Sequence, residues 1–222
     1  PALPLRLDNV MVEPILKVEG LKTHFKLREG ILKAVDGISF SLAPDEVLCI
    51  VGESGSGKSV TAQSILRLID PPGHIVEGRI LYRDKDLLDL SEREMEKIRG
   101  DRIGMIFQDP MTSLNPVFTV GRQLTETLFR HTNMSDTEAK ARALDLLHQV
   151  GISDPARRLT QFPHHLSGGM RQRVMIAMAL CCEPKLIIAD EPTTALDVTI
   201  QAQILELMKE LSERLGVAQL II

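Results

Sequence analysis

Aromatic residues and excess positive charge are both scarce in this chain. Among its 222 residues there are six phenylalanines, one tyrosine and no tryptophan. Lysine and arginine together number 26 against 30 aspartates and glutamates, which gives a formal net charge of −4. Proteins that bind nucleic acids usually offer a basic face or aromatic side chains on which bases stack. The composition therefore indicates no nucleic-acid partner.

Cysteine is also rare, with three residues and no CxxC pair. An odd number without ligand spacing excludes a disulfide framework and a cysteine-rich metal site. Cys181 and Cys182 are neighbours in an apolar stretch, where we expect small buried hydrophobic residues. His164 and His165 are adjacent too, and adjacent residues of a helix do not face the same side. We interpret both histidines as ordinary polar residues and not as metal ligands.

Long hydrophobic runs are missing. The longest, Val174 to Cys182, has nine residues, about half of what a helix needs to cross a bilayer. The first twenty residues carry scattered charges, such as Arg6 and Glu13, and contain no secretory hydrophobic segment. Hydrophobic residues at 44% and charged residues at 25% are typical of a folded protein with one or two domains. We therefore expect a folded, cytoplasmic protein without a membrane span.

Hydrophobic patterning predicts an α/β chain whose strands are short. Alternating polar and apolar residues at the start predict a small set of strands, whereas the apolar run before Gly52 predicts a buried parallel strand. A helix is expected directly afterwards, over Ser59–Leu68. The predicted strands are Ile15–Phe25, Ala34–Ser41, Glu46–Val51, Arg102–Phe107, Lys185–Ala189 and Ala218–Ile222.

Capping residues mark the expected helices. Ser91 with Glu94, and Ser135 with Glu138, match the pattern of a capping box. The middle third, about Asp109 to Cys182, is therefore expected to be a helical insertion. A last helix is predicted from about Thr199 to its glycine stop at Gly216. The apolar stripes are Ala139, Ala143, Leu147 and Val150 in the helix that Gly151 ends, and Ile200, Ile204, Leu207, Leu211 and Leu215 in the last one.

A glycine-rich segment carries the strongest chemical signal. Residues 52–59 read G-E-S-G-S-G-K-S and match G-x-x-x-x-G-K-[ST] between a predicted strand and a predicted helix. Glycines let consecutive backbone N–H groups approach a phosphate chain, and the helix that begins there adds its positive dipole end. Lys58 is expected to reach the β- and γ-phosphates, and the Ser59 hydroxyl to ligate Mg²⁺.

Two acids follow the predicted strand that ends at Ala189. Ligands of open α/β sheets bind at the carboxyl ends of the strands, where Asp190 and Glu191 are expected. We expect Asp190 to hold Mg²⁺ through the hydration shell of the ion. Glu191, which strand alternation directs the other way, is expected to activate the attacking water. With the phosphate loop, these acids predict a site that hydrolyses a nucleoside triphosphate.

A third segment, L-S-G-G-M-R-Q-R at 166–173, resembles the signature motif of ATP-binding-cassette (ABC) ATPases. In that family the serine and glycines form a second anion site at a helix N-terminus. Ser167 lies 23 residues before Asp190, a spacing that fits the family. Met170 replaces the commoner glutamine, as is usual in the branch of oligopeptide, dipeptide and nickel importers. The resemblance spans about Ile15 to Ile222.

The resemblance implies roles for further residues. Gln108 looks like the glutamine of the Q-loop, a catalytic residue and metal ligand, and Ala195-Leu196-Asp197 looks like the D-loop. Phe25 resembles the aromatic residue that stacks on adenine. Lys58 and Glu191 complete the implied catalytic set, and Ser59, Gln108 and Asp190 the metal set. The implied ATP-binding residues are Phe25, Gly52, Glu53, Ser54, Gly55, Ser56, Gly57, Lys58, Ser59, Val60, Ser167, Gly168, Gly169 and Asp197.

The resemblance also implies a fold and an assembly. We expect an α/β cassette with a mostly parallel sheet, a small N-terminal antiparallel β subdomain and an inserted helical subdomain. Residues 1–222 would form one domain, with its core at 1–108 and 183–222 and its helical part at 109–182. ATP and Mg²⁺ are the expected cofactors. A second ABC ATPase subunit, identical or not, and two transmembrane permease subunits are the expected direct partners.

Peptide import is the expected function, at the cytoplasmic face of the inner membrane and with a solute-binding protein as an indirect partner. The family's switch histidine is expected beyond Ile222. We therefore expect that the natural protein continues past this residue and that these 222 residues hydrolyse ATP only weakly. Nickel remains an alternative cargo. The sequence also leaves open an ABC ATPase acting on DNA or ribosomes, a small-molecule kinase and a nucleotide-binding regulator without turnover.

Overall fold

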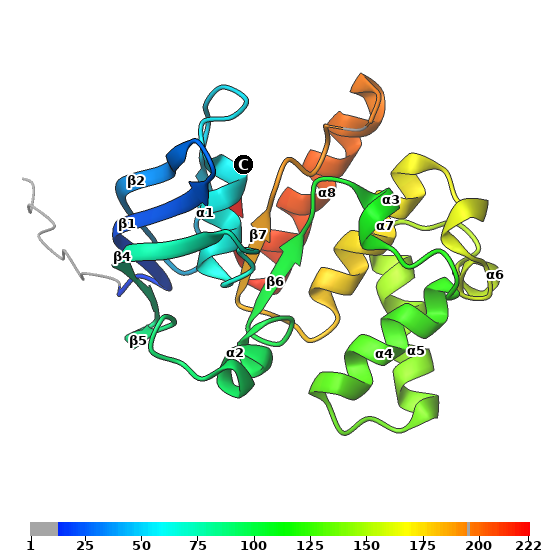
Figure 1. Ribbon diagram of the computed structural model, residues 1–222. Helices are drawn as coiled ribbons and strands as arrows, with labels where there is room; N and C mark the ends of the chain where they lie inside the picture. The colour runs from blue at the N-terminus through cyan, green and yellow to red at the C-terminus, as the bar shows by residue number, and fades with distance from the viewer. Residues whose placement is uncertain (1–12, 195) are drawn as a thin grey trace, which may run out of the picture.

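The computed structural model describes residues 13–194 and 196–222. It is an α/β structure in which two four-stranded sheets lie to one side of a group of helices (Figure 1). The first sheet is antiparallel and the second is wholly parallel. The predicted fold class is therefore confirmed.

The antiparallel sheet has the order β2-β1-β4-β5. In β1, buried residues alternate with more exposed ones, so that one face of the sheet is buried, and Leu16, Leu21 and Ile80 are fully buried there. The sequence prediction missed β4, because Gly78 and several charged residues interrupt its apolar pattern. The strands of this sheet are β1 (Leu16–Leu27), β2 (Gly30–Leu42), β4 (Gly73–Tyr82) and β5 (Lys85–Asp86).

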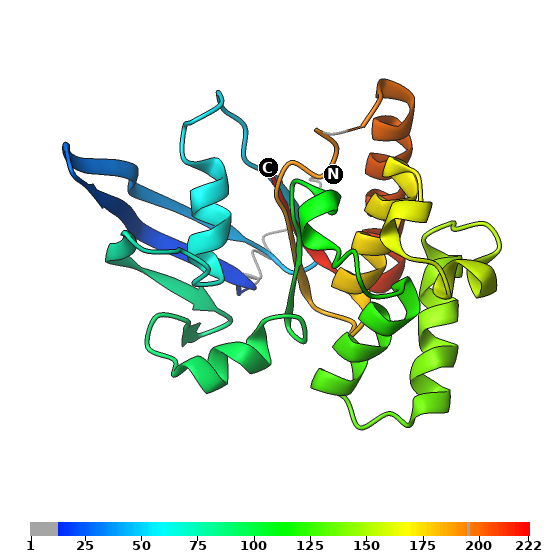
Figure 2. The same ribbon diagram turned by 45° about the vertical axis from the view of Figure 1, so that its right-hand side comes forward.

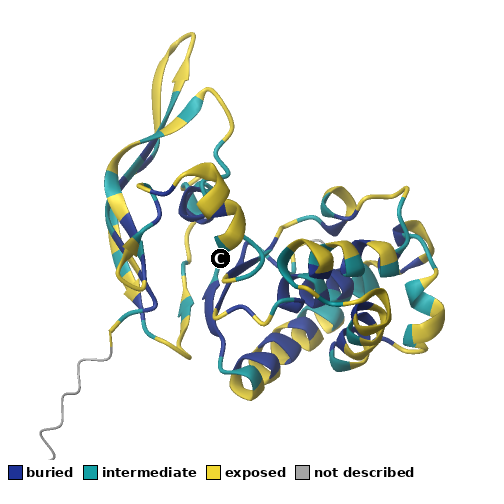
Figure 3. Cartoon of the chain, turned by 90° about the horizontal axis from the view of Figure 1, so that it is seen from below, coloured by how far each residue is buried: buried dark blue, intermediate teal, exposed yellow. Residues whose placement is uncertain are grey.

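The parallel sheet has the order β3-β8-β7-β6. Because its strands all run the same way, their carboxyl ends meet at one edge. The central strands are apolar and buried, as Figure 3 shows by their dark blue colour. The strands are β3 (Val47–Cys49), β6 (Ile103–Ile106), β7 (Leu186–Ala189) and β8 (Ala218–Ile221).

The expectation of a buried strand over Glu46–Val51 is wrong in length and in burial. The strand β3 has three residues and, among the described residues, pairs with β8 alone. Val47 is 46% exposed and Val51, in the loop that follows, is 88% exposed. An apolar run indicates burial only where both faces of a strand are covered, and this condition is not met for β3 at the edge of the sheet.

Helices α2 and α5 begin directly after their predicted capping serines, whereas the helix expected over Ser59–Leu68 ends earlier, at Ile65. Glu94 and Glu138 each accept hydrogen bonds from the backbone N–H and the hydroxyl of the capping serine. The stripe of α5 is buried, and left-handed glycines, Gly151 and Gly216, follow α5 and α8. The helices are α1 (Lys58–Ile65), α2 (Glu92–Ile98), α3 (Pro110–Ser113), α4 (Val120–His131), α5 (Asp136–Gln149), α6 (Pro155–Leu159), α7 (Gly168–Leu180) and α8 (Val198–Leu215), with a 3₁₀ turn at Pro163–His165.

Helices α3 to α7 gather on one side of the parallel sheet, whereas α1 lies on the other side (Figures 1 and 2). Helix α7 packs against both the parallel sheet and the other helices, because its buried residues belong to one apolar cluster with residues of α4, α5 and β7. No helix formed by residues 13–194 and 196–222 has both the length and the apolar character that a membrane span requires.

Candidate functional site

The phosphate loop lies between β3 and α1, as the sequence predicts. Gly55 and Gly57 have φ angles of 81° and 89°, in the left-handed region that favours glycine. A Cβ atom on Gly57 would lie 2.0 Å from the carbonyl oxygen of Ala34 on β2. Gly57 is also the N-cap of α1. The close approach to β2 therefore requires glycine at this position.

The loop curls around the side chain of Lys58. Its ammonium group donates hydrogen bonds to the carbonyl oxygens of Gly52 at 2.8 Å and Glu53 at 2.7 Å. This positive charge lies in the first turn of α1, where the helix dipole is also positive. The combination of a cationic group and a helix N-terminus favours an anionic ligand.

Ser59 and Asp190 meet although 131 residues separate them in the sequence. The Ser59 hydroxyl, in the first turn of α1, donates to Oδ1 of Asp190 at 2.9 Å. Asp190 follows β7 directly and is only 4% exposed. Burial raises the pKa of this carboxyl group, and the hydrogen bond from Ser59 counteracts the rise. A cation beside Asp190 would also counteract it.

Glu191 is brought together with Gln108, because β6 and β7 are parallel neighbours and each residue follows the end of its strand. The amide Nε2 of Gln108 donates to Oε2 of Glu191 at 2.8 Å. The hydroxyl of Thr194, which the sequence prediction did not include, donates to the same oxygen at 2.9 Å. The carboxylate is thus held from two loops.

The expected reason for the orientation of Glu191 is wrong. The strand β7 ends at Ala189, so strand alternation does not direct the Glu191 side chain. Its φ of 45° places the residue in the left-handed region instead. Few residues other than glycine adopt that conformation, and those that do often lie at functional sites.

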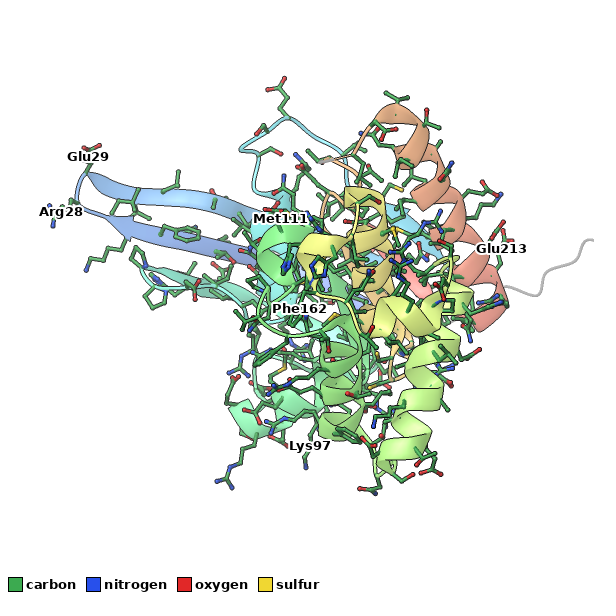
Figure 4. All side chains as sticks on the ribbon, turned by 90° about the vertical axis from the view of Figure 1, so that its right-hand side faces the viewer. Arg28, Glu29, Lys97, Met111, Phe162 and Glu213 are labelled. Atoms are coloured by element: carbon green, nitrogen blue, oxygen red, sulfur yellow. The ribbon has the colours of Figure 1, made fainter. Side chains whose placement is uncertain are left out.

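A groove of about 410 Å³ connects these elements. One end is apolar, because it is formed by the β1–β2 hairpin, whose tip at Arg28 and Glu29 extends away from the rest of the molecule (Figure 4). The ring of Phe25 lines this end and packs over the backbone of Gly73 on β4. The lining residues are Phe25, Leu27, Leu32, Ala34, Ser54, Gly55, Gly57, Lys58, Ser59, Val60, Gln108 and Glu191.

The sequence prediction missed three of these lining residues. Leu27, Leu32 and Ala34 carry no motif, and their nearness to the phosphate loop depends on how β1 and β2 pair, with Phe25 opposite Leu32. Of the residues predicted to bind nucleotide, Gly52, Glu53 and Ser56 belong to the same loop but not to the lining. Their place in the groove follows from the register of the β1–β2 hairpin, which no motif in the sequence records.

The signature segment lies elsewhere. Ser167 caps α7 by accepting a hydrogen bond from the N–H of Met170 at 3.4 Å, and Gly168 and Gly169 open that helix. A Cβ on Gly169 would lie 2.9 Å from Cγ2 of Ile200 on α8. None of Ser167, Gly168 and Gly169 lines the groove. The structure therefore separates this helix tip from the phosphate loop of the same chain.

The predicted D-loop is described only in part, because Ala195 lies outside the described residues. Asp197 is the N-cap of α8, and its carboxylate accepts a hydrogen bond from the N–H of Ile200 at 3.0 Å. It does not line the groove. Within one chain, Asp197 therefore acts as a helix cap beside the signature segment.

The residues predicted to hold magnesium have suitable chemistry: Ser59 and Asp190 are in contact, and Gln108 lines the same groove as Ser59. A hydroxyl, a carboxylate and an amide all supply oxygen, which hard divalent cations prefer. Among the residues that the structure describes, no three histidine, cysteine, aspartate or glutamate side chains form a cluster. Mg²⁺ typically takes one or two carboxylates and completes its shell with water and phosphate oxygens.

The ABC transporter family model matches residues 35–194 of this chain. The chain belongs to the ABC transporter family. The match extends from β2 beyond Glu191, and thus includes the phosphate loop, Gln108 and the signature segment. The family resemblance predicted from the motifs is confirmed.

Similar ABC proteins are known by sequence and by structure. The oligopeptide transport ATP-binding protein OppD of Bacillus subtilis (strain 168) is 59% identical over 207 residues, 93% of this chain and 58% of that protein. The dipeptide transport ATP-binding protein DppD of Escherichia coli (strain K12) is 53% identical over 208 residues, 94% of this chain and 64% of that protein. The chain thus spans about three fifths of these ABC proteins.

A solved ABC cassette has the same fold. The ATP-binding cassette MJ0796, in a dimeric post-hydrolysis state bound to ADP and Pi, superposes with a TM-score of 0.82 at 33% identity. The match covers 93% of this chain and 86% of that chain. The similarity therefore includes both sheets and the helical region of the ABC fold.

Proposed function

We propose that this chain binds and hydrolyses ATP to power an ABC importer of oligopeptides or dipeptides. The observation that carries the proposal is the single groove that joins an apolar platform, a phosphate loop and two hydrolytic side chains, Gln108 and Glu191. The names of OppD and DppD support ATP binding and a peptide cargo. Nickel remains the alternative cargo that the sequence leaves open.

Each part of the groove has one task in this proposal. Phe25 stacks on the adenine ring, while the loop's backbone N–H groups and Lys58 bind the phosphates. Ser59, Asp190 and Gln108 would hold Mg²⁺, which supplies charge neutralisation at the phosphate oxygens when bound. Glu191 accepts a proton from the attacking water. The hydrogen bond from Gln108 orients the Glu191 carboxylate for that step.

A second cassette completes each site in this proposal. Ser167 to Gly169 do not line their own chain's groove, and MJ0796 is dimeric in its complex with ADP and Pi. Two cassettes, identical or different, would pair head to tail so that Ser167 of one reaches the phosphates held by Lys58 of the other. Asp197 would lie at the same interface.

The proposed setting is the cytoplasmic face of the inner membrane. Two permease subunits would dock on the helical subdomain at 109–182, with the core at 1–108 and 183–222 facing the second cassette. A solute-binding protein would deliver the peptide to the permeases without contacting this chain, and no nucleic acid is involved.

The first test is Glu191→Gln. Loss of general-base help should slow ATP hydrolysis by about 100-fold or more, while calorimetry finds Mg·ATP binding unchanged. Glu206→Gln, at an exposed position of α8, is the matched control and should keep the wild-type rate. Turnover by Glu191→Gln at the control's rate would remove Glu191 from its role.

A second test addresses the pairing of cassettes. Ser167→Arg places a bulky cation at the tip of α7 and should abolish ATP-dependent dimerisation in sedimentation experiments. Binding of Mg·ATP to the monomer should remain, because Ser167 is outside the groove. Normal dimerisation of this variant would contradict the head-to-tail arrangement.

A further inference from the structure

The loop that follows Glu191 returns to it. The Thr194 hydroxyl donates to Oε2 of Glu191 at 2.9 Å, and the Thr194 N–H donates to the Glu191 carbonyl oxygen at 3.3 Å. Gln108 donates to the same Oε2 at 2.8 Å. Two neutral donors from two loops therefore converge on one carboxylate oxygen.

Gln201 holds this loop against α8. Its side-chain amide Nε2 donates to the carbonyl oxygens of Thr193 and Leu196, both at 3.0 Å. These two carbonyl oxygens flank Thr194 in the sequence, and the N–H of Leu196 donates to the Thr193 carbonyl oxygen at 3.0 Å. The carbonyl oxygens of Thr193 and Leu196 thus both accept from one side chain in the first turn of α8. Figure 1 shows this loop between β7 and α8.

The two donors to Glu191 differ in whether they have a second proposed role in the groove. Gln108 is also in the oxygen set proposed for Mg²⁺, and only its amide oxygen can serve there, so a bound cation constrains the direction of the amide. Thr194 has no such second task in the groove, since it is absent from the lining. The left-handed backbone of Glu191, with φ at 45°, is a strained conformation that persists where the surrounding structure holds it.

We propose that Thr194 is a positioning residue for Glu191 and that Gln201 acts through it by holding Thr193 and Leu196. The inference rests on the proposed function, in which Glu191 is the general base. In this arrangement Thr194 keeps the carboxylate directed at the water whichever way the Gln108 amide is turned. Gln201 lies one residue after Ile200, which packs against Gly169, so the loop is anchored beside the signature segment.

The test compares Thr194→Val with Thr194→Ser. Valine keeps the shape but loses the hydroxyl, so kcat for ATP should fall by at least about 10-fold, as expected for one hydrogen bond to a charged group. The KM for ATP and the calorimetric affinity for Mg·ATP should stay within about twofold of wild type. Serine restores the donor and should restore kcat. Thr127→Val, whose hydroxyl bonds only within α4, is the matched control.

Gln201→Met provides the second arm. It removes both loop hydrogen bonds and should lower kcat to a similar extent with little change in KM. The double variant Thr194→Val/Gln201→Met should have a kcat within about twofold of that of the slower single variant, because both substitutions act on one contact. If the two single-variant losses of kcat multiply in the double variant, the role of Gln201 is overturned.

The outcomes separate this inference from the proposed function. Wild-type kcat in Thr194→Val, or a serine variant as slow as the valine variant, would overturn the role of Thr194. If Glu191→Gln is slow in the same assay, the general base stands and only the inference falls. If Thr194→Val melts much earlier than wild type, Thr194→Ala replaces it under the same criteria.

Discussion

The contact between the phosphate loop and β2 makes a quantitative prediction for Gly57→Ala. At φ 89° an alanine adopts a left-handed conformation, which costs about 1–2 kcal/mol. Its Cβ would also lie 2.0 Å from the Ala34 carbonyl oxygen, which is a backbone atom and cannot rotate away. Forcing such an overlap into a packed structure costs typically about 1–3 kcal/mol. The free energy of unfolding should therefore fall by roughly 2–5 kcal/mol.

Gly55→Ala is the matched control for this prediction. Gly55 has a similar φ of 81°, but nothing lies within 4 Å of a Cβ built on it. Only the conformational cost of about 1–2 kcal/mol applies to it. The difference between the two variants, about 2 kcal/mol, isolates the contact with Ala34.

Thermal unfolding measures this difference. For a domain of 222 residues, a loss of 2 kcal/mol lowers Tm by roughly 4–8 °C. Gly57→Ala should therefore melt that much below Gly55→Ala. Ala34 also lines the groove, so calorimetry should find that Gly57→Ala binds Mg·ATP more weakly. Equal melting temperatures of the two variants would refute the close approach of the loop to β2.

Three further predictions follow from burial and capping. Asp190→Asn should raise the free energy of unfolding of the ligand-free protein in urea by about 1 kcal/mol, because it removes a buried carboxylate, and should abolish ATP hydrolysis; a lower free energy of unfolding would contradict the cost of burial. Iodoacetamide at pH 8 should label only the exposed Cys49 of the folded protein, because burial raises the pKa of Cys181 to about 12 and of Cys182 to about 11; mass spectrometry that finds two or three labels would be contrary evidence. Hydrogen bonds from the capping serine lower the pKa of Glu138. The contribution of its ionised carboxylate to the free energy of unfolding is therefore present at neutral pH and lost as the pH falls below about 4. Glu138→Ala should therefore lower the urea midpoint at pH 7 but not near pH 3.

The sequence could predict the phosphate loop because its chemistry is local. Gly52 to Ser59 are consecutive, and glycine, lysine and serine are each required by backbone geometry or charge at fixed spacing. The helix boundaries at Ser135 and Gly216 were predicted for the same reason, since a cap depends on residues three or four positions apart. The signature segment likewise opens a helix at its own serine.

What the sequence could not predict depends on long-range pairing. The strand β4 reads as polar and interrupted, and it becomes a strand because β1 offers it hydrogen-bonding partners. The exposure of Val47 follows from its place at a sheet edge, which no local pattern records. The apolar wall of the groove at Leu27 and Leu32 depends on the register of the β1–β2 hairpin.

By itself, the sequence determined which groups can bind phosphate and which acidic residues can serve in hydrolysis, because motif chemistry requires particular residues at particular spacings. Only the tertiary structure decided how those groups face one another. The parallel order of β6 and β7 brings Gln108 to Glu191, and a left-handed backbone with a returning Thr194 sets the direction of the carboxylate. Direction is a property of the folded backbone, which residue types alone do not specify.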